Sequence, residues 1–106
     1  MRLLRFSIAG QKLTRALGCD FSNIMGGSKG YLWARFTFPA EWAGFKKVAV
    51  FTHKGKEYPV GLDKANSCEV PEEVLAGGNV PVHVYVVGQR DRTRIQTNAV
   101  AFKVSR

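Results

Sequence analysis

The second half of the chain alternates apolar residues with other residues in short runs, and turn-forming residues separate each run from the next. Because successive side chains of a β-strand point to opposite faces, this alternation predicts strands with one buried and one solvated face. Several such runs at short spacing are typical of an antiparallel sandwich or barrel. The runs span residues 48–52, 58–62, 80–86 and 100–104. A domain of this class usually works by presenting a surface.

The first half of the chain predicts further strands and one long loop. The strands are expected over residues 4–8, 12–17 and 31–38. Pro39 ends the last of them, because proline cannot donate to a β-ladder. Residues 18–30 lack a clear period and contain several glycines, which predicts a loop. Long loops on a β scaffold are either flexible or functional.

Turn-forming residues separate the remaining strands. Lys54-Gly55 predicts a tight hairpin turn, where glycine supplies a positive φ angle. Pro71 followed by Glu72-Glu73 predicts one short helical turn, because proline suits the first helical position and acids favour the positive end of the helix dipole. Gly77-Gly78 is expected to end that turn.

The shared alternation also predicts which side chains form the core. Trp42 and Phe45 are expected to point inward and close one end of it, and Val74 and Leu75 to cap one end from the helical turn. The predicted core comprises Leu4, Phe6, Ile8, Phe36, Phe38, Trp42, Val48, Val50, Tyr58, Val60, Leu62, Val70, Leu75, Val82, Val84, Val100, Phe102 and Val104.

Length and composition indicate an ordinary globular domain. The chain has 106 residues, of which 45% are hydrophobic and 23% charged, so we expect a single domain over residues 1–106. No apolar run approaches the ~20 residues of a membrane helix, so no membrane association is expected. The charged, alternating start resembles a strand more than a signal peptide, which favours a cytoplasmic protein.

Residues able to carry catalysis or bind metal are few and scattered. Cys19 and Cys68 are too far apart for a metal framework, and in a reducing compartment we expect free thiols. His53 and His83 have no third ligand at a regular spacing. Nothing marks Cys68 as an activated nucleophile.

Two acidic or glycine-rich motifs also have structural explanations. Residues 26–30 (Gly-Gly-Ser-Lys-Gly) lack the spacing of a phosphate-binding loop, and a strand follows where a helix is required. Glu72 and Glu73 are accounted for by the helical turn. We therefore expect a protein that is not an enzyme and that needs neither a cofactor nor a metal.

The charge of the chain is strongly positive. Sixteen Lys and Arg residues against eight Asp and Glu give a formal net charge of +8. This balance indicates either solubility or affinity for an acidic partner. Most of the basic residues are dispersed, and the densest cluster is Arg90, Arg92 and Arg94, with Asp91 among them.

The aromatic strand offers a second binding hypothesis. Tyr31, Trp33 and Arg35 fall on one face of residues 31–38, where they could stack nucleic-acid bases. In a sandwich, a tryptophan on a central strand usually packs in the core instead. The sequence leaves both alternatives open.

One stretch of the chain resembles a known class of proteins. The resemblance lies in residues 31–38, Glu41-Trp42, residues 45–51 and 58–63, the Val-Pro-Glu-Glu-Val-Leu run at 70–75, the valine-rich residues 80–88 and Thr97-Asn98. This order resembles small immunoglobulin-like structural proteins of tailed bacteriophages and prophages of Gram-positive bacteria, some related to N-terminal domains of baseplate or fibre proteins. It covers about residues 31–104 and brings no catalytic residue with it.

Together with the alternation, the resemblance implies an immunoglobulin-like antiparallel β-sandwich of about seven strands with one short helical turn. It implies a non-enzymatic phage structural or accessory protein, in the virion or the host cytoplasm, that docks on capsid, tail or baseplate components or on copies of itself. The alternative is a basic protein that binds nucleic acid or a host factor during infection. We expect partner binding through Arg90, Arg92 and Arg94 and through Lys29 of the glycine loop.

Overall fold

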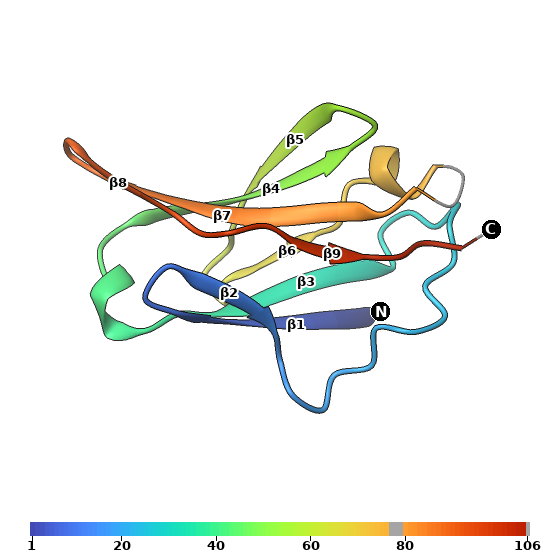
Figure 1. Ribbon diagram of the computed structural model, residues 1–106, viewed down its shortest axis with the longest axis horizontal. Helices are drawn as coiled ribbons and strands as arrows, with labels where there is room; N and C mark the ends of the chain where they lie inside the picture. The colour runs from blue at the N-terminus through green and yellow to red at the C-terminus, as the bar shows by residue number, and fades with distance from the viewer. Residues whose placement is uncertain (77–79, 106) are drawn as a thin grey trace.

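The computed structural model describes residues 1–76 and 80–105, which form two β-sheets packed face to face (Figure 1). Within these ranges the chain forms nine strands and two 3-10 turns. Their bounds are β1 Arg2–Ala9, β2 Lys12–Arg15, β3 Leu32–Thr37, η1 Ala40–Trp42, β4 Lys46–His53, β5 Lys56–Gly61, β6 Ser67–Glu69, η2 Glu72–Leu75, β7 Val82–Arg90, β8 Thr93–Gln96 and β9 Val100–Phe102. The expected all-β, sandwich-like fold is confirmed.

The last strand is divided, which is one reason why the described strands outnumber the expected seven. Both β8 and β9 pair with β7, and Thr97 lies between them. The Thr97 hydroxyl accepts a hydrogen bond from the amide of Val86 (3.0 Å), while the Thr97 amide donates to the Val86 carbonyl (3.0 Å). A side chain thus replaces one backbone partner of the ladder, and the strand is interrupted there.

The first sheet has the strand order β2-β1-β3-β6, and it corrects the expectation of a purely antiparallel fold. β1 and β3 run parallel, with Arg2 opposite Leu32 at one end and Ser7 opposite Thr37 at the other. Parallel neighbours need a long connection, because the chain must return to the end from which it started. The β1–β2 hairpin and the loop over residues 16–31 supply that connection.

The second sheet is antiparallel, with the order β5-β4-β7; β8 and β9 follow one another along the other edge of β7, β8 beside residues 87–90 and β9 beside residues 82–84. The core lies between the two sheets, where β1 and β3 face β4, β7 and β9. The largest fully buried side chains are Trp42, Phe6, Phe36, Phe51, Phe102, Leu4, Leu13, Leu75, Val70, Val74, Val82 and Val84.

The predicted inward face of β4 is wrong. Ala49 and Phe51, each 0% exposed, belong to the core, whereas Val48 is only partly buried. Val50 is buried too, but it lies on the outer side, between Pro59 and Tyr85 of the neighbouring strands. Since both faces of β4 are apolar, alternation alone could not decide between them, and a shift of one residue exchanges the faces.

Several other predicted core residues lie at its border. They are partly buried and pack against the core: Phe38, Tyr58, Val60, Leu62 and Val100. Conversely, Leu13 and Ile24 are buried although the expected core did not contain them. Both come from the first thirty residues, where the apolar pattern is interrupted.

The two 3-10 turns close the sandwich at opposite ends. Trp42 in η1 is fully buried and its Nε1 donates to the carbonyl of Gly10 (2.8 Å); Phe45 is also buried. Both were expected to point inward, and this is confirmed. Val74 and Leu75 in η2 are each 1% exposed, as the expected helical turn after Pro71 requires. The proposed end of that turn at Gly77-Gly78 lies outside the described residues.

Candidate recognition surfaces

The β7–β8 hairpin extends beyond the body of the sandwich and carries the densest group of arginines (Figure 1). Arg90 pairs with Thr93, so Asp91 and Arg92 form the connecting turn. Asp91 has a φ of 52°, a left-handed conformation that aspartate tolerates better than most residues. The three arginines therefore lie on a regular hairpin and not on an irregular loop.

Arg90 differs from its two neighbours because it is held by the protein. Its guanidinium lies over the ring of Phe45, 4.6 Å from the centroid, and its Nη1 donates to the carbonyl of Ala43 (3.4 Å). The base of the hairpin is also fixed, because a Cβ atom at Gly88 would lie 2.8 Å from Cζ3 of Trp42. All three arginines are exposed, but no cation–π contact or hydrogen bond to the body of the sandwich is seen for the side chains of Arg92 and Arg94 among the described residues. Two of the three predicted residues are thus displayed on a hairpin that the third anchors.

Lys29 does not join this cluster. It lies in the loop at the opposite end of the molecule, which measures 40 Å along its longest axis (Figure 1). Its Nζ forms an exposed ion pair with Glu72 (3.8 Å). The loop itself is tied down, because the amides of Gly26 and Gly27 donate to the carbonyls of Ser105 (2.7 Å) and Leu75 (2.9 Å). The four predicted partner-binding residues therefore form two separate surfaces.

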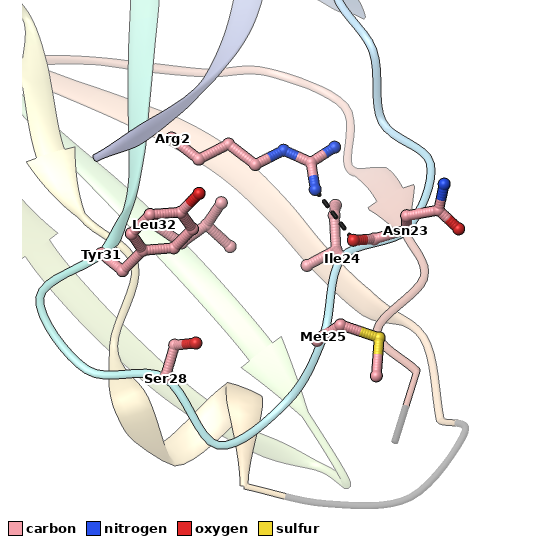
Figure 2. A pocket seen from close by; sticks show the side chains of 7 residues that line it. All are labelled: Arg2, Asn23, Ile24, Met25, Ser28, Tyr31 and Leu32. Atoms are coloured by element: carbon pink, nitrogen blue, oxygen red, sulfur yellow. Dashed lines mark hydrogen bonds between the residues drawn. The ribbon is translucent and has the colours of Figure 1, made fainter.

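A small hollow of about 190 Å³ lies beside the glycine loop (Figure 2). Met25 and Tyr31 are exposed at its rim, and the guanidinium of Arg2 crosses one side. Arg2 donates to the carbonyls of Asp20, Ser22 and Asn23, so it fastens the loop to the start of β1. The hollow is smaller than the ~300–1,000 Å³ of typical small-molecule sites.

The candidate nucleophile and the histidines are dispersed. Burial, together with the charge of Asp63, raises the pKa of the Cys68 thiol to about 12, so the reactive thiolate is disfavoured. Cys19 and Cys68 are both free. The imidazole of His53 is buried and its Nδ1 has no hydrogen-bond partner, while His83 is exposed. In the described part of the chain no three His, Cys, Asp or Glu side chains gather as metal ligands.

The outer face of the first sheet resolves the alternative left open for the aromatic strand. Leu32, Ala34 and Phe36 point into the core, so Trp33 and Arg35 point outward. Tyr31 is separate, because it lines the hollow at the end of the sheet. The parallel register places Arg5 of β1 directly beside Arg35. The expected burial of Leu4, Phe6 and Ile8 leaves Arg5 on the outer face of its strand, but the sequence could not reveal the parallel pairing that makes it a neighbour of Arg35.

Comparison with known proteins gives this chain no relative: no family model, no characterised protein and no solved structure matches it. Among the residues that the structure describes, no helix is long and apolar enough to cross a membrane.

Proposed function

We propose that this protein is a non-enzymatic, immunoglobulin-like docking domain that binds an acidic protein surface through the β7–β8 hairpin. The observation that carries the proposal is that Arg90 packs on Phe45 and holds the hairpin in place, while the side chains of Arg90, Arg92 and Arg94 are all exposed. A preorganised hairpin loses little conformational freedom on binding, so more of the contact energy remains as affinity.

The chemistry of the tip favours carboxylates. Arginine forms bidentate hydrogen bonds to carboxylate groups and is enriched among the residues that dominate protein interfaces. Asp91 in the turn lowers the net charge of the tip, which favours a mixed protein surface over bare phosphate. Two copies of the chain would bring arginine tips of like charge together, so self-association through the hairpin is disfavoured.

The setting that we propose is a tailed-phage particle, in which the protein docks on capsid, tail or baseplate components. This setting rests on the resemblance of residues 31–104 to small immunoglobulin-like phage structural proteins. A sandwich suits such a role because its shape persists while its hairpins and loops vary.

The test is the incorporation of a double variant, R92S/R94S, into particles purified from the phage or prophage that encodes the chain. Loss of the variant from the particles, measured by quantitative mass spectrometry, is expected. Folding should be nearly unchanged, because exposed charges stabilise little. The matched control is K54S/K56S, which removes two charges from the β4–β5 hairpin. Normal incorporation of R92S/R94S would refute docking through the hairpin.

A further inference from the structure

The outer face of the first sheet presents a short basic and aromatic surface, which we call the Trp33 face. It consists of Trp33, Arg35 and Thr37 on β3, of Leu3, Arg5 and Ser7 on β1, and of Ser67 and Glu69 on β6. The register arranges these residues in rows across the strands, with Arg5 beside Arg35 and Ser7 beside Thr37. Neighbouring strands lie ~4.8 Å apart, and Trp33 and Arg35 are separated by two residues, ~6.6 Å, along β3.

The two arginines lie side by side without a neutralising acid. Like charges directly opposite each other on a sheet are destabilising. Within residues 1–76 and 80–105 no carboxylate lies within ion-pair distance of either guanidinium. Arg35 donates from Nε to the hydroxyl of Ser67 on β6 (2.9 Å), on the other side of β3 from Arg5, which fixes the Arg35 side chain and leaves both Nη atoms for an external acceptor. The face is therefore prepared for an anion that the chain itself does not supply.

The indole of Trp33 is held at the edge of this pair. Its Nε1 donates to the carbonyl of Gly30 (3.3 Å), and the amide of Gly30 donates to Glu69, the residue opposite Trp33 on β6. Glu69 is the acidic residue of the face, and this bond occupies one of its oxygens. Trp33 is partly exposed, whereas Trp42 is fully buried. The indole thus offers a fixed aromatic surface next to two guanidinium groups.

We infer that the Trp33 face binds single-stranded nucleic acid, with a base stacked on Trp33 and the phosphate backbone across Arg5 and Arg35. Aromatic side chains beside a positively charged track are the common means by which proteins bind single strands without sequence preference. A duplex keeps its bases stacked inside, so the indole would have no base to contact. The net charge of +8 adds long-range attraction to a polyanion. This inference does not depend on docking through the β7–β8 hairpin.

The test uses the full chain and fluorescein-labelled dT12 and U12, titrated at several salt concentrations. R5S/R35S is expected to weaken binding strongly and to flatten the salt dependence by about 1.4 units of log K per log salt, for two lost phosphate contacts. The matched control, R92S/R94S, removes the same charge from the hairpin tip and should change affinity far less. The conservative variant R5K/R35K should retain most of the salt dependence.

Stacking is tested separately through Trp33. Oligonucleotide should quench the tryptophan fluorescence of the native chain, because Trp33 is accessible and Trp42 is not. W33A is expected to bind roughly 5- to 150-fold more weakly, which corresponds to the usual value of one stacked base. Y31A, which removes an exposed aromatic ring from the hollow, is the control. W33F should retain part of the affinity, and thermal melting of each variant confirms that it is folded.

Three outcomes would overturn the inference. Equal losses from R5S/R35S and R92S/R94S would show that the overall charge alone attracts the strand. No binding of either oligonucleotide at low salt would exclude the ligand. If W33A binds oligonucleotide normally but fails to join particles, the face contacts protein. If R92S/R94S still joins particles, the inference about the Trp33 face is unaffected. If the Trp33 face binds no oligonucleotide, docking through the hairpin is unaffected, because different variants test the two surfaces.

Discussion

The two sheets turn different surfaces to the solvent. The outer face of the second sheet carries partly buried Val48 and Val87, and its principal polar contact is internal: Tyr85 donates to Glu57 (2.8 Å). The outer face of the first sheet carries Arg5 and Arg35 side by side with no acid between them. The second face contains this internal pair, whereas the two arginines of the first face have no carboxylate within ion-pair distance among the described residues. The comparison assigns stability to the outer face of the second sheet and, by the inference above, recognition to the outer face of the first.

The largest effect should come from the inner face of β4. F51A removes a fully buried ring, and we expect it to lower the free energy of unfolding by ~3–5 kcal/mol. V48A, three residues earlier and on the outer face, should cost about 1 kcal/mol or less. Urea unfolding of both variants measures the difference. A larger loss from V48A would mean that the faces of β4 are the reverse of those described.

A smaller effect on stability should follow from replacing a glycine by alanine on each face of the second sheet. In G88A the new Cβ would lie 2.8 Å from the ring of Trp42, so the Trp42 side chain must shift. We expect the free energy of unfolding to fall by ~1–3 kcal/mol. Nothing lies within 4 Å of the same position in G61A, which should be nearly neutral. Thermal unfolding compares the two. Equal stabilities would show that Gly88 is not packed against Trp42.

The internal pairing of the second outer face should appear in its titration. The hydrogen bond to Glu57, with smaller effects of burial and of the carboxylate charge, raises the pKa of Tyr85. A raised pKa in the folded state means that this bond stabilises the protein below pH ~10 and is lost as the pH rises through the folded pKa. Ultraviolet titration should therefore show one late tyrosine, which E57Q moves toward the ordinary value. An unchanged titration in E57Q would contradict this pairing.

The smallest effect should be a gain in stability on the first outer face. R5E replaces a repulsive neighbour of Arg35 with an attractive one, and we expect a gain of ~0.2–1 kcal/mol. R92E at the hairpin tip makes the same change in charge without a facing arginine and should gain nothing comparable. Differential scanning calorimetry at low salt measures both. If R5E lost stability, the two arginines would not be an uncompensated pair.

How far the sequence predicts this fold depends on the contrast between the faces of each strand. In β3, Leu32, Ala34 and Phe36 alternate with Trp33, Arg35 and Thr37, and the expected burial of Phe36 on the first of these faces is confirmed. In β4, valines alternate with Ala49 and Phe51, so both faces are apolar and the inward face was predicted wrongly. Local turns were easier, because Pro71 and the Lys54-Gly55 pair fix backbone geometry by themselves.

The candidate surfaces show the same limit. The arginine cluster was predictable because Arg90, Arg92 and Arg94 are close in sequence. The neighbourhood of Arg5 and Arg35 was not, because it depends on a parallel pairing between distant strands that no local pattern encodes. The anchoring of Arg90 on Phe45 likewise required the tertiary structure. Lys29 was expected to bind a partner from the glycine loop, and the fold places that loop at the other end of the molecule from the hairpin (Figure 1).

The parallel pairing of β1 with β3 also bears on the order in which the chain folds. Short turns join β4 to β5 and β7 to β8, so these strands can pair as local hairpins. By contrast, β1 can pair with β3 only after the 16–31 loop closes. Because loop closure must precede the contacts that reward it, we expect the second sheet to form early and the first sheet to join after the rate-limiting step. Substitutions such as A34G in β3 should then mainly accelerate unfolding, while F51A should also slow refolding. Stopped-flow chevron plots of the two variants would distinguish this order from simultaneous assembly, in which both would slow refolding alike.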